Sequence, residues 1–217
     1  MLARWLVALV ALVAPIAQAQ NAEIAATVTD ERGKPVADAV VIAVPADGSL
    51  RVSPRPREEV VDQVDKEFLP KVQAVLVGTP VTFPNRDSVR HHVYSFSPAK
   101  RFELPLYTGV PQAVVFDTPG VVILGCNIHD WMVGYVYVSE SPYFAKTNAE
   151  GKAVLTDVPP RVYLVRVWHP QLAVAENATH KNVEASRAQR TEVTWTLNLK
   201  PEVRIRRAPA AGQRGGY

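Results

Sequence analysis

Residues 120–138 read GVVILGCNIHDWMVGYVYV, two strand-like apolar runs joined by a short polar turn. Cys126, His129 and Met132 lie in and beside this turn at intervals of three residues. The chain of 217 residues has one cysteine and two methionines, and the other methionine is Met1. A single Cys or Met is usually a packing residue, but both sulfur-containing side chains here lie in one turn beside a histidine. This joint placement indicates a shared chemical role.

The first twenty residues, MLARWLVALVALVAPIAQAQ, predict the compartment. Arg4 precedes an apolar core, and a small-x-small cleavage site ends at Ala19. We expect residues 1–19 to be a cleaved signal peptide and the protein to be periplasmic or secreted. The alternative is an uncleaved anchor, which is disfavoured because about 20 apolar residues are needed to span a bilayer. No later segment is long and apolar enough to cross a membrane, and a lone cysteine cannot form an internal disulfide in an oxidising compartment.

The composition predicts an all-β protein. The chain has 18 prolines, 11 glycines and many Val-rich runs, and no long stretch shows helical periodicity. The formal charge of +3 is accounted for by Arg4 and the tail at residues 201–217, which we expect to be flexible. Because no basic residues are concentrated in the remaining part, we expect no nucleic-acid partner.

The two ends of the chain share a pattern of short apolar strands separated by Gly and Pro turns. VTDERGKPVADAVV at residues 28–41 and AKTNAEGKAVLTDVPPRVYLVRVWHP at residues 145–170 resemble the two halves of a carboxypeptidase-regulatory-like or transthyretin-like β-sandwich. That family runs from its first hairpin almost directly to the later strands. Here we expect residues 22–48 and 143–200 to form one small sandwich, with a second domain at residues 50–140 inserted at a loop tip. The alternative is that residues 22–48 only add strands to the central domain.

The middle segment resembles the cupredoxins, in particular the plastocyanin and amicyanin group. The similar stretches are AVLVGTPVTFPNRDSVRHHVYSF at residues 74–96 and TPGVVILGCNIHDWMVGYVYV at residues 118–138. The resemblance implies a Greek-key β-sandwich that holds one type 1 (blue) copper. The implied ligands are His91, Cys126, His129 and Met132. His92, the next residue along the strand, stays an alternative to His91.

Copper chemistry supports this ligand set. Two imidazoles and one thiolate in a trigonal plane, with a weak axial thioether, suit both oxidation states of copper. The competing interpretation is a Cys-His nucleophilic pair. That pair would leave Met132 unexplained, and no orienting group for it is obvious in the sequence. His169 and His180 are expected to lie outside the site.

Three residues depart from the cupredoxin pattern. His92 occupies a position where Asn commonly ties the two ligand loops together, and we expect its ring to do the same. Gly125 replaces the aromatic residue that often precedes the cysteine, so we expect electron transfer to depend on the surface around His129. Asp130 puts a charge beside that surface.

The sequence therefore predicts a copper protein of electron transport that is not an enzyme. It would pass single electrons between redox proteins that dock near His129 and Trp131. The alternative for Trp131 is that it is buried beneath the site as a packing residue. Two alternatives stay open. One is a copper protein of trafficking or storage, and the other is an interaction module in which copper has a structural role.

Overall fold

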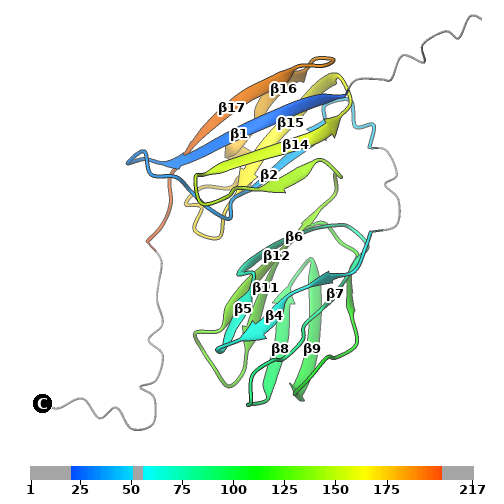
Figure 1. Cartoon of the computed structure of the whole chain (residues 1–217), viewed down its shortest axis with the longest axis vertical. Helices are drawn as coiled ribbons and strands as arrows, with labels where there is room; N and C mark the ends of the chain where they lie inside the picture. Colours follow the sequence, from blue (N-terminus) through cyan, green and yellow to red (C-terminus); the bar gives the residue numbers. More distant parts are fainter. Residues whose placement is uncertain (1–20, 51–55, 202–217) are drawn as a thin grey trace, which may run out of the picture.

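The computed structural model describes residues 21–50 and 56–201, which form β-strands almost throughout (Figure 1). The all-β prediction is confirmed. Within these ranges the structure has one helical element, the short 3-10 helix η1 (Glu176–Thr179). No helix in the described part of the chain has both the length and the apolar character needed to cross a bilayer. The expected signal peptide at residues 1–19 and residues 202–217 of the expected tail lie outside the described ranges.

Strands from the two ends of the chain form one β-sandwich, which we call the outer sandwich. Its sheets have the orders β14-β1-β17 and β13-β2-β15-β16. The strands are β1 (Ala22–Asp30), β2 (Val40–Pro45), β13 (Phe144–Lys146), β14 (Lys152–Val158), β15 (Arg161–Trp168), β16 (Lys181–Ala185) and β17 (Arg190–Leu197). β1 pairs antiparallel with β14 and parallel with β17, so the start of the chain is held by strands far along the sequence.

A turn in which Gly33 has a φ of +75° follows β1, and β1 and β2 do not pair with each other. They belong to different sheets, and the connection between them crosses from one layer to the other. Val36 and Ala39 of this connection are buried in the core between the two sheets. Each of the two strands has its partners in the late segment of the chain.

The strands between residues 59 and 139 form a second sandwich, which we call the middle sandwich. Its sheets have the orders β6-β12-β11-β8-β9 and β10-β7-β3, and β4 and β5 pair with each other. The strands are β3 (Glu59–Val60), β4 (Asp62–Val64), β5 (Glu67–Leu69), β6 (Val72–Leu76), β7 (Thr79–Thr82), β8 (His91–Ser97), β9 (Lys100–Tyr107), β10 (Val114–Phe116), β11 (Gly120–Cys126) and β12 (Val133–Ser139). Cys126 and Met132 belong to its buried core. The independent folding of residues 50–140 stays a prediction.

A third apolar cluster joins the two sandwiches. Successive side chains of a strand point to opposite faces, and three strands use both faces for burial. In β15, Val167 packs inside the outer sandwich while Trp168 points toward the middle one. Trp168 meets Tyr137 and Tyr135 of β12, with ring centroids 5.4 and 5.9 Å apart. The complete buried cluster is Val40, Ile42, Val72, Tyr137 and Trp168.

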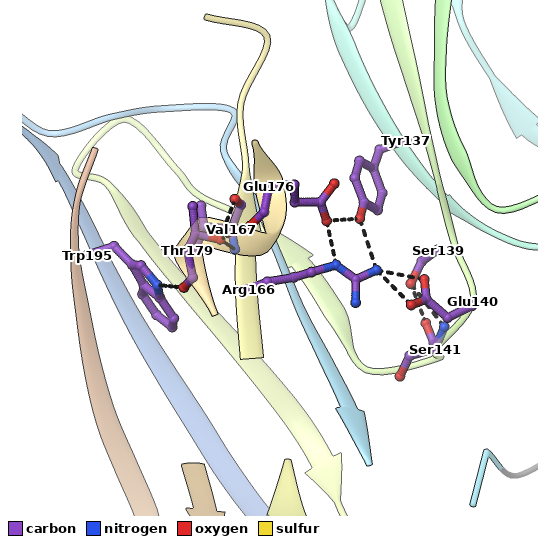
Figure 2. Close-up of polar contacts among 9 residues, drawn as sticks. All are labelled: Tyr137, Ser139, Glu140, Ser141, Arg166, Val167, Glu176, Thr179 and Trp195. Carbon is purple, nitrogen blue, oxygen red and sulfur yellow. Dashed lines mark hydrogen bonds and ion pairs between the residues drawn. The ribbon is translucent and has the colours of Figure 1, made fainter. Parts of the chain in front are cut away.

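A polar network centred on Arg166 crosses the same boundary, as Figure 2 shows. Arg166 Nη2 donates to both carboxylate oxygens of Glu140 at 2.7 and 2.9 Å, and Nε donates to Glu176 Oε1 at 2.5 Å. The Tyr137 hydroxyl donates to the same Glu176 oxygen at 2.5 Å. Burial and the Glu176 carboxylate raise the pKa of Tyr137 above its ordinary value. One guanidinium therefore ties β12 of the middle sandwich to β15 and η1 of the outer one.

Replacing Arg166 by Ala should lower the free energy of unfolding by about 2–3 kcal/mol, because two partly buried carboxylates lose a charged hydrogen-bond donor. Urea unfolding followed by circular dichroism measures the change. Arg190→Ala is the matched control: Arg190 is 52% exposed in its ion pairs with Glu23 and Glu192, so its loss should cost under about 0.5 kcal/mol. Equal effects of the two substitutions would show that the Arg166 network does not hold the sandwiches together.

Candidate metal centre

Three potential ligands converge at one end of the middle sandwich. The ligand atoms of His91, Cys126 and His129 all lie within 4.8 Å of one another. His91 is the first residue of β8, Cys126 is the last residue of β11, and His129 lies in the turn that leads to β12. Pairing of Cys126 with Val93 across β11 and β8 brings the strand ends together. The structure therefore places three of the four predicted ligands around one point.

The orientation of the two histidine rings fits a metal ion. The Nδ1 atoms of His91 and His129 are each 3.8 Å from Cys126 Sγ, and the two ring centroids are 4.9 Å apart. Metal–nitrogen bonds of about 2.05 Å and a metal–sulfur bond of about 2.3 Å, at a trigonal angle, would separate nitrogen from sulfur by about 3.8 Å. The residues present therefore have the spacing that a trigonal N₂S site needs.

Met132 follows the ligand turn and packs in the core of the middle sandwich. Its backbone N–H donates to the His129 carbonyl at 2.9 Å, which closes the ligand turn. The side chain is 1% exposed and packs in the same core cluster as Cys126. A buried thioether in the same core cluster as the thiol is suited to the weak axial position of a blue-copper site. The axial role of Met132 stays a prediction.

Burial differs among the ligands. His91 and Cys126 are buried, whereas His129 is partly exposed. Burial lowers the pKa of His129, and its electrostatic interactions with His91 and Lys66 act in the same direction. A lower pKa favours the neutral imidazole, which is the form that binds metal. Because His129 is partly exposed and His91 is buried, His129 is the histidine of this group that a partner can reach.

Asp87 orients His91, and sequence reasoning did not single it out. His91 Nε2 is 2.7 Å from Asp87 Oδ2, and the backbone N–H groups of Asp65 and Lys66 donate to the same carboxylate at 2.7 and 2.9 Å. Burial acts to raise the pKa of Asp87, but the hydrogen bonds from His91 and the two N–H groups outweigh it and lower the pKa. The carboxylate favours a proton on Nε2, which leaves the Nδ1 lone pair facing Cys126.

The loop that carries Asp87 is itself braced. The Asn85 side-chain amide donates to the carbonyls of Val89 and Tyr107 at 2.9 and 2.8 Å, and its oxygen accepts the Asp87 N–H at 3.0 Å. Asn85 is buried. The signal for Asp87 in the sequence is an acidic residue four positions before a ligand histidine, next to an Asn that can fold the loop back on itself.

Replacing Asp87 by Asn should raise the reduction potential of the copper-loaded protein, because a negative charge that favours the oxidised metal is removed. We expect a shift on the order of 60 mV or more, which for one electron is about 1.4 kcal/mol. Protein-film voltammetry measures it. Asp117→Asn is the control, since Asp117 is 62% exposed and pairs with Lys100 away from the ligands. A potential that moves equally in both variants would remove Asp87 from its assigned role.

His92 lies outside the ligand group and links two loops. Its Nδ1 is 3.1 Å from Asn127 Nδ2, the residue that follows Cys126. This contact is the tie between ligand loops that we expected of His92. Its Nε2 is 2.9 Å from Glu103 Oε1, at the distance of an ion pair but without the geometry of a hydrogen bond. The sequence predicted a tie between the loops but did not say that Asn127 would be its partner.

Trp131 combines the two roles considered for it. Its ring centroid is 5.2 Å from that of His129 at an interplanar angle of 57°. The residue is half-buried, and its indole nitrogen is buried without a hydrogen-bond partner among the described residues. The neighbouring Ile128 is 49% exposed. Trp131 thus supports the ring of His129 and also contributes to the surface around it.

His169 and His180 belong to the outer sandwich, away from the group of His91, Cys126 and His129.

In the comparison with known proteins, the matches are to solved structures. No protein-family model matches the chain, and no curated protein matches it. Solved structures that are similar to this chain include cupredoxins. A purple cupredoxin from Nitrosopumilus maritimus is 29% identical over 38% of this chain and 99% of its own, with a TM-score of 0.33. A mutant of amicyanin in the Cu(I) state is 24% identical over 38% of this chain and 82% of its own, with a TM-score of 0.35.

A copper-containing nitrite reductase from Thermus scotoductus SA-01 is also similar, with 26% identity over 53% of this chain and a TM-score of 0.36. This chain covers 28% of the reductase. Since these TM-scores are low, the functional conclusion depends on the ligand geometry. The chain has a β-sandwich with a His-Cys-His group, and cupredoxins are its structural neighbours.

Proposed function

We propose that this protein carries single electrons through one type 1 copper held by His91, Cys126, His129 and Met132. The observation that supports it is the pair of Nδ1–Sγ distances of 3.8 Å, together with the burial of Met132 in the same core. Copper bound there would supply a one-electron couple. We also propose a periplasmic or secreted location, and redox proteins as partners that dock at the surface formed by Ile128, His129 and Trp131.

The residues around the ligands suit such a role. Asp87 and Asn85 hold His91 in one orientation, and His92 braces the loop after Cys126. Ligands that are held in place by their surroundings rearrange little when the metal changes its oxidation state. His129 brings one ring edge to the surface, where a partner can approach it. The chain therefore shields the thiol from water and leaves the ring edge of His129 accessible to a partner.

The alternative of copper trafficking or storage is disfavoured by burial. A protein that hands copper to another needs ligands that the recipient can reach. Here His91, Cys126 and Met132 are 0%, 4% and 1% exposed. A role limited to stabilising the fold would not require the partly exposed His129.

A Cu(II) titration of the full protein lacking residues 1–19 tests the proposal. We expect one equivalent to produce an intense thiolate-to-copper absorption in the visible range and a type 1 electron paramagnetic resonance spectrum. Ascorbate should bleach the colour and ferricyanide should restore it. Tight binding of Cu(I) with no coloured Cu(II) form would instead favour trafficking or storage.

Trp131→Ala should slow electron self-exchange between the Cu(I) and Cu(II) forms several-fold while the copper spectrum stays nearly unchanged. In self-exchange, two molecules would meet through the surfaces around their His129 rings. The substitution removes the large amphipathic Trp131 ring from that contact surface. Line broadening in nuclear magnetic resonance spectra measures the rate. Val174→Ala on the outer sandwich, 48% exposed, is the control and should have no effect. If Trp131→Ala instead destroys the copper spectrum, the residue serves only as packing.

A further inference from the structure

A row of aromatic rings follows the outer face of β8. His92, Tyr94 and Phe96 point to this face, while the intervening Val93 and Ser95 are buried. The ring centroids are 5.9 Å apart for His92 and Tyr94 and 5.1 Å apart for Tyr94 and Phe96. The row begins at the buried His92 and ends at Phe96, which is 74% exposed. It therefore runs from the ligand loops toward solvent.

Tyr94 of this row covers the backbone next to the thiol ligand. It is the register partner of Gly125 in the pairing of β8 with β11. A Cβ atom built on Gly125 would lie 2.7 Å from Tyr94 Cζ and 2.8 Å from its Oη. Glycine is required here by space, since only a residue without a side chain lets the Tyr94 ring lie against its main chain. Gly125 is bonded directly to Cys126.

We propose that Tyr94 couples Cys126 to the outer face of the sheet, so that the face around Phe96 is a second point of electron entry, separate from His129. The inference rests on the proposed electron-transfer function. Electron tunnelling is far more efficient through covalent bonds and atoms in contact than across gaps. The Tyr94 ring, the Gly125 main chain and the Cys126 side chain form a continuous path of this kind.

The proposal departs from the expectation that electron transfer depends on the surface around His129. That expectation follows from Gly125, which has no aromatic side chain. In the structure a neighbouring strand places the Tyr94 ring over that position. The Tyr94 ring can lie there because Gly125 has no side chain.

The surface at the outer end of the path is apolar and continues an interface that already exists. Ile123 of β11 is 51% exposed and lies opposite Tyr135 of β12 in register. Tyr135 packs against Trp168 of the outer sandwich. The outer sandwich thus covers this sheet face over β12 and leaves Ile123 and Phe96 open beside it. The partner that fits is a redox protein that surrounds its own centre with an apolar contact surface.

Attachment of a ruthenium bipyridine complex to an introduced histidine tests the path without a natural partner. Arg101 of β9 is exposed and pairs with Phe96, so Arg101→His puts the label at the proposed entry point. Flash photolysis of the copper-loaded protein then gives the electron-transfer rate between copper and ruthenium. Tyr94→Leu should slow this rate several-fold because a gap replaces the ring, whereas Tyr94→Phe should keep most of it.

A second label separates coupling from structural damage. Arg86→His puts the complex near the ligand end, in the loop that leads to His91, and its rate should not respond to Tyr94→Leu. The visible spectrum, the potential and the unfolding midpoint of the copper-free protein should stay unchanged in both Tyr94 variants. Gly125→Ala should displace the ring and slow the Arg101 label as Tyr94→Leu does, and the double variant should be no slower than either one.

Equal rates for the parent and Tyr94→Leu at the Arg101 label would overturn the second path and leave the proposed function standing. Equal slowing at both labels would also overturn it, since the effect would then lie in the copper site itself. If the parent protein has no thiolate-to-copper band at all, the proposed function fails and the path through Cys126 fails with it.

Discussion

Replacing Cys126 by Ser is expected to abolish the visible colour of the copper-loaded protein. The intense band requires a thiolate bound to copper, and the chain has no other cysteine that could take over. Ser keeps a similar volume in a site that is 4% exposed, so the fold should survive. Absorption and electron paramagnetic resonance spectra of equally loaded samples measure the loss.

Met132→Leu provides the matched comparison. Leucine fills about the same core volume as methionine, so the coloured thiolate complex should form, with an altered potential because the axial thioether is missing. A Cys126→Ser protein that keeps its band would disprove the copper assignment. A Met132→Leu protein that loses all copper would give Met132 a larger role than that of a weak axial ligand.

The second large effect concerns the two adjacent histidines. His91→Ala should lose the blue centre, because the His91 Nδ1 lies 3.8 Å from the thiol and Asp87 holds the ring in place. His92→Ala should keep the colour and bind copper less tightly, because it removes only the contact to Asn127 of the ligand loop. Copper dissociation constants and spectra of both variants distinguish the roles.

Addition of imidazole makes the test specific for a missing ligand. Imidazole can enter the space left by His91→Ala and restore part of the blue spectrum, whereas a merely misfolded variant would not respond. The opposite pattern, with colour lost in His92→Ala and kept in His91→Ala, would move the ligand by one residue and reverse the faces of β8.

Local sequence was sufficient to predict the class of fold and to suggest which residue types bind the metal. Strands show a period of two and short apolar runs between turn residues, and these signals are carried by neighbouring positions. Cys126, His129 and Met132 lie in one turn, so their proximity follows from the chain itself. His91 could be added only through the resemblance to cupredoxins, because the pairing of β8 with β11 joins segments more than thirty residues apart.

Tertiary structure alone decided which faces of the strands are covered and which residues support the ligands. The apolar runs of β2, β12 and β15 are buried on both faces, so their pattern cannot say which side meets the other sandwich. Asp87 reaches His91, and Tyr94 reaches Gly125, through loop folding and strand register. Such contacts depend on the three-dimensional pairing of distant segments, and a single sequence contains no local signal for that pairing.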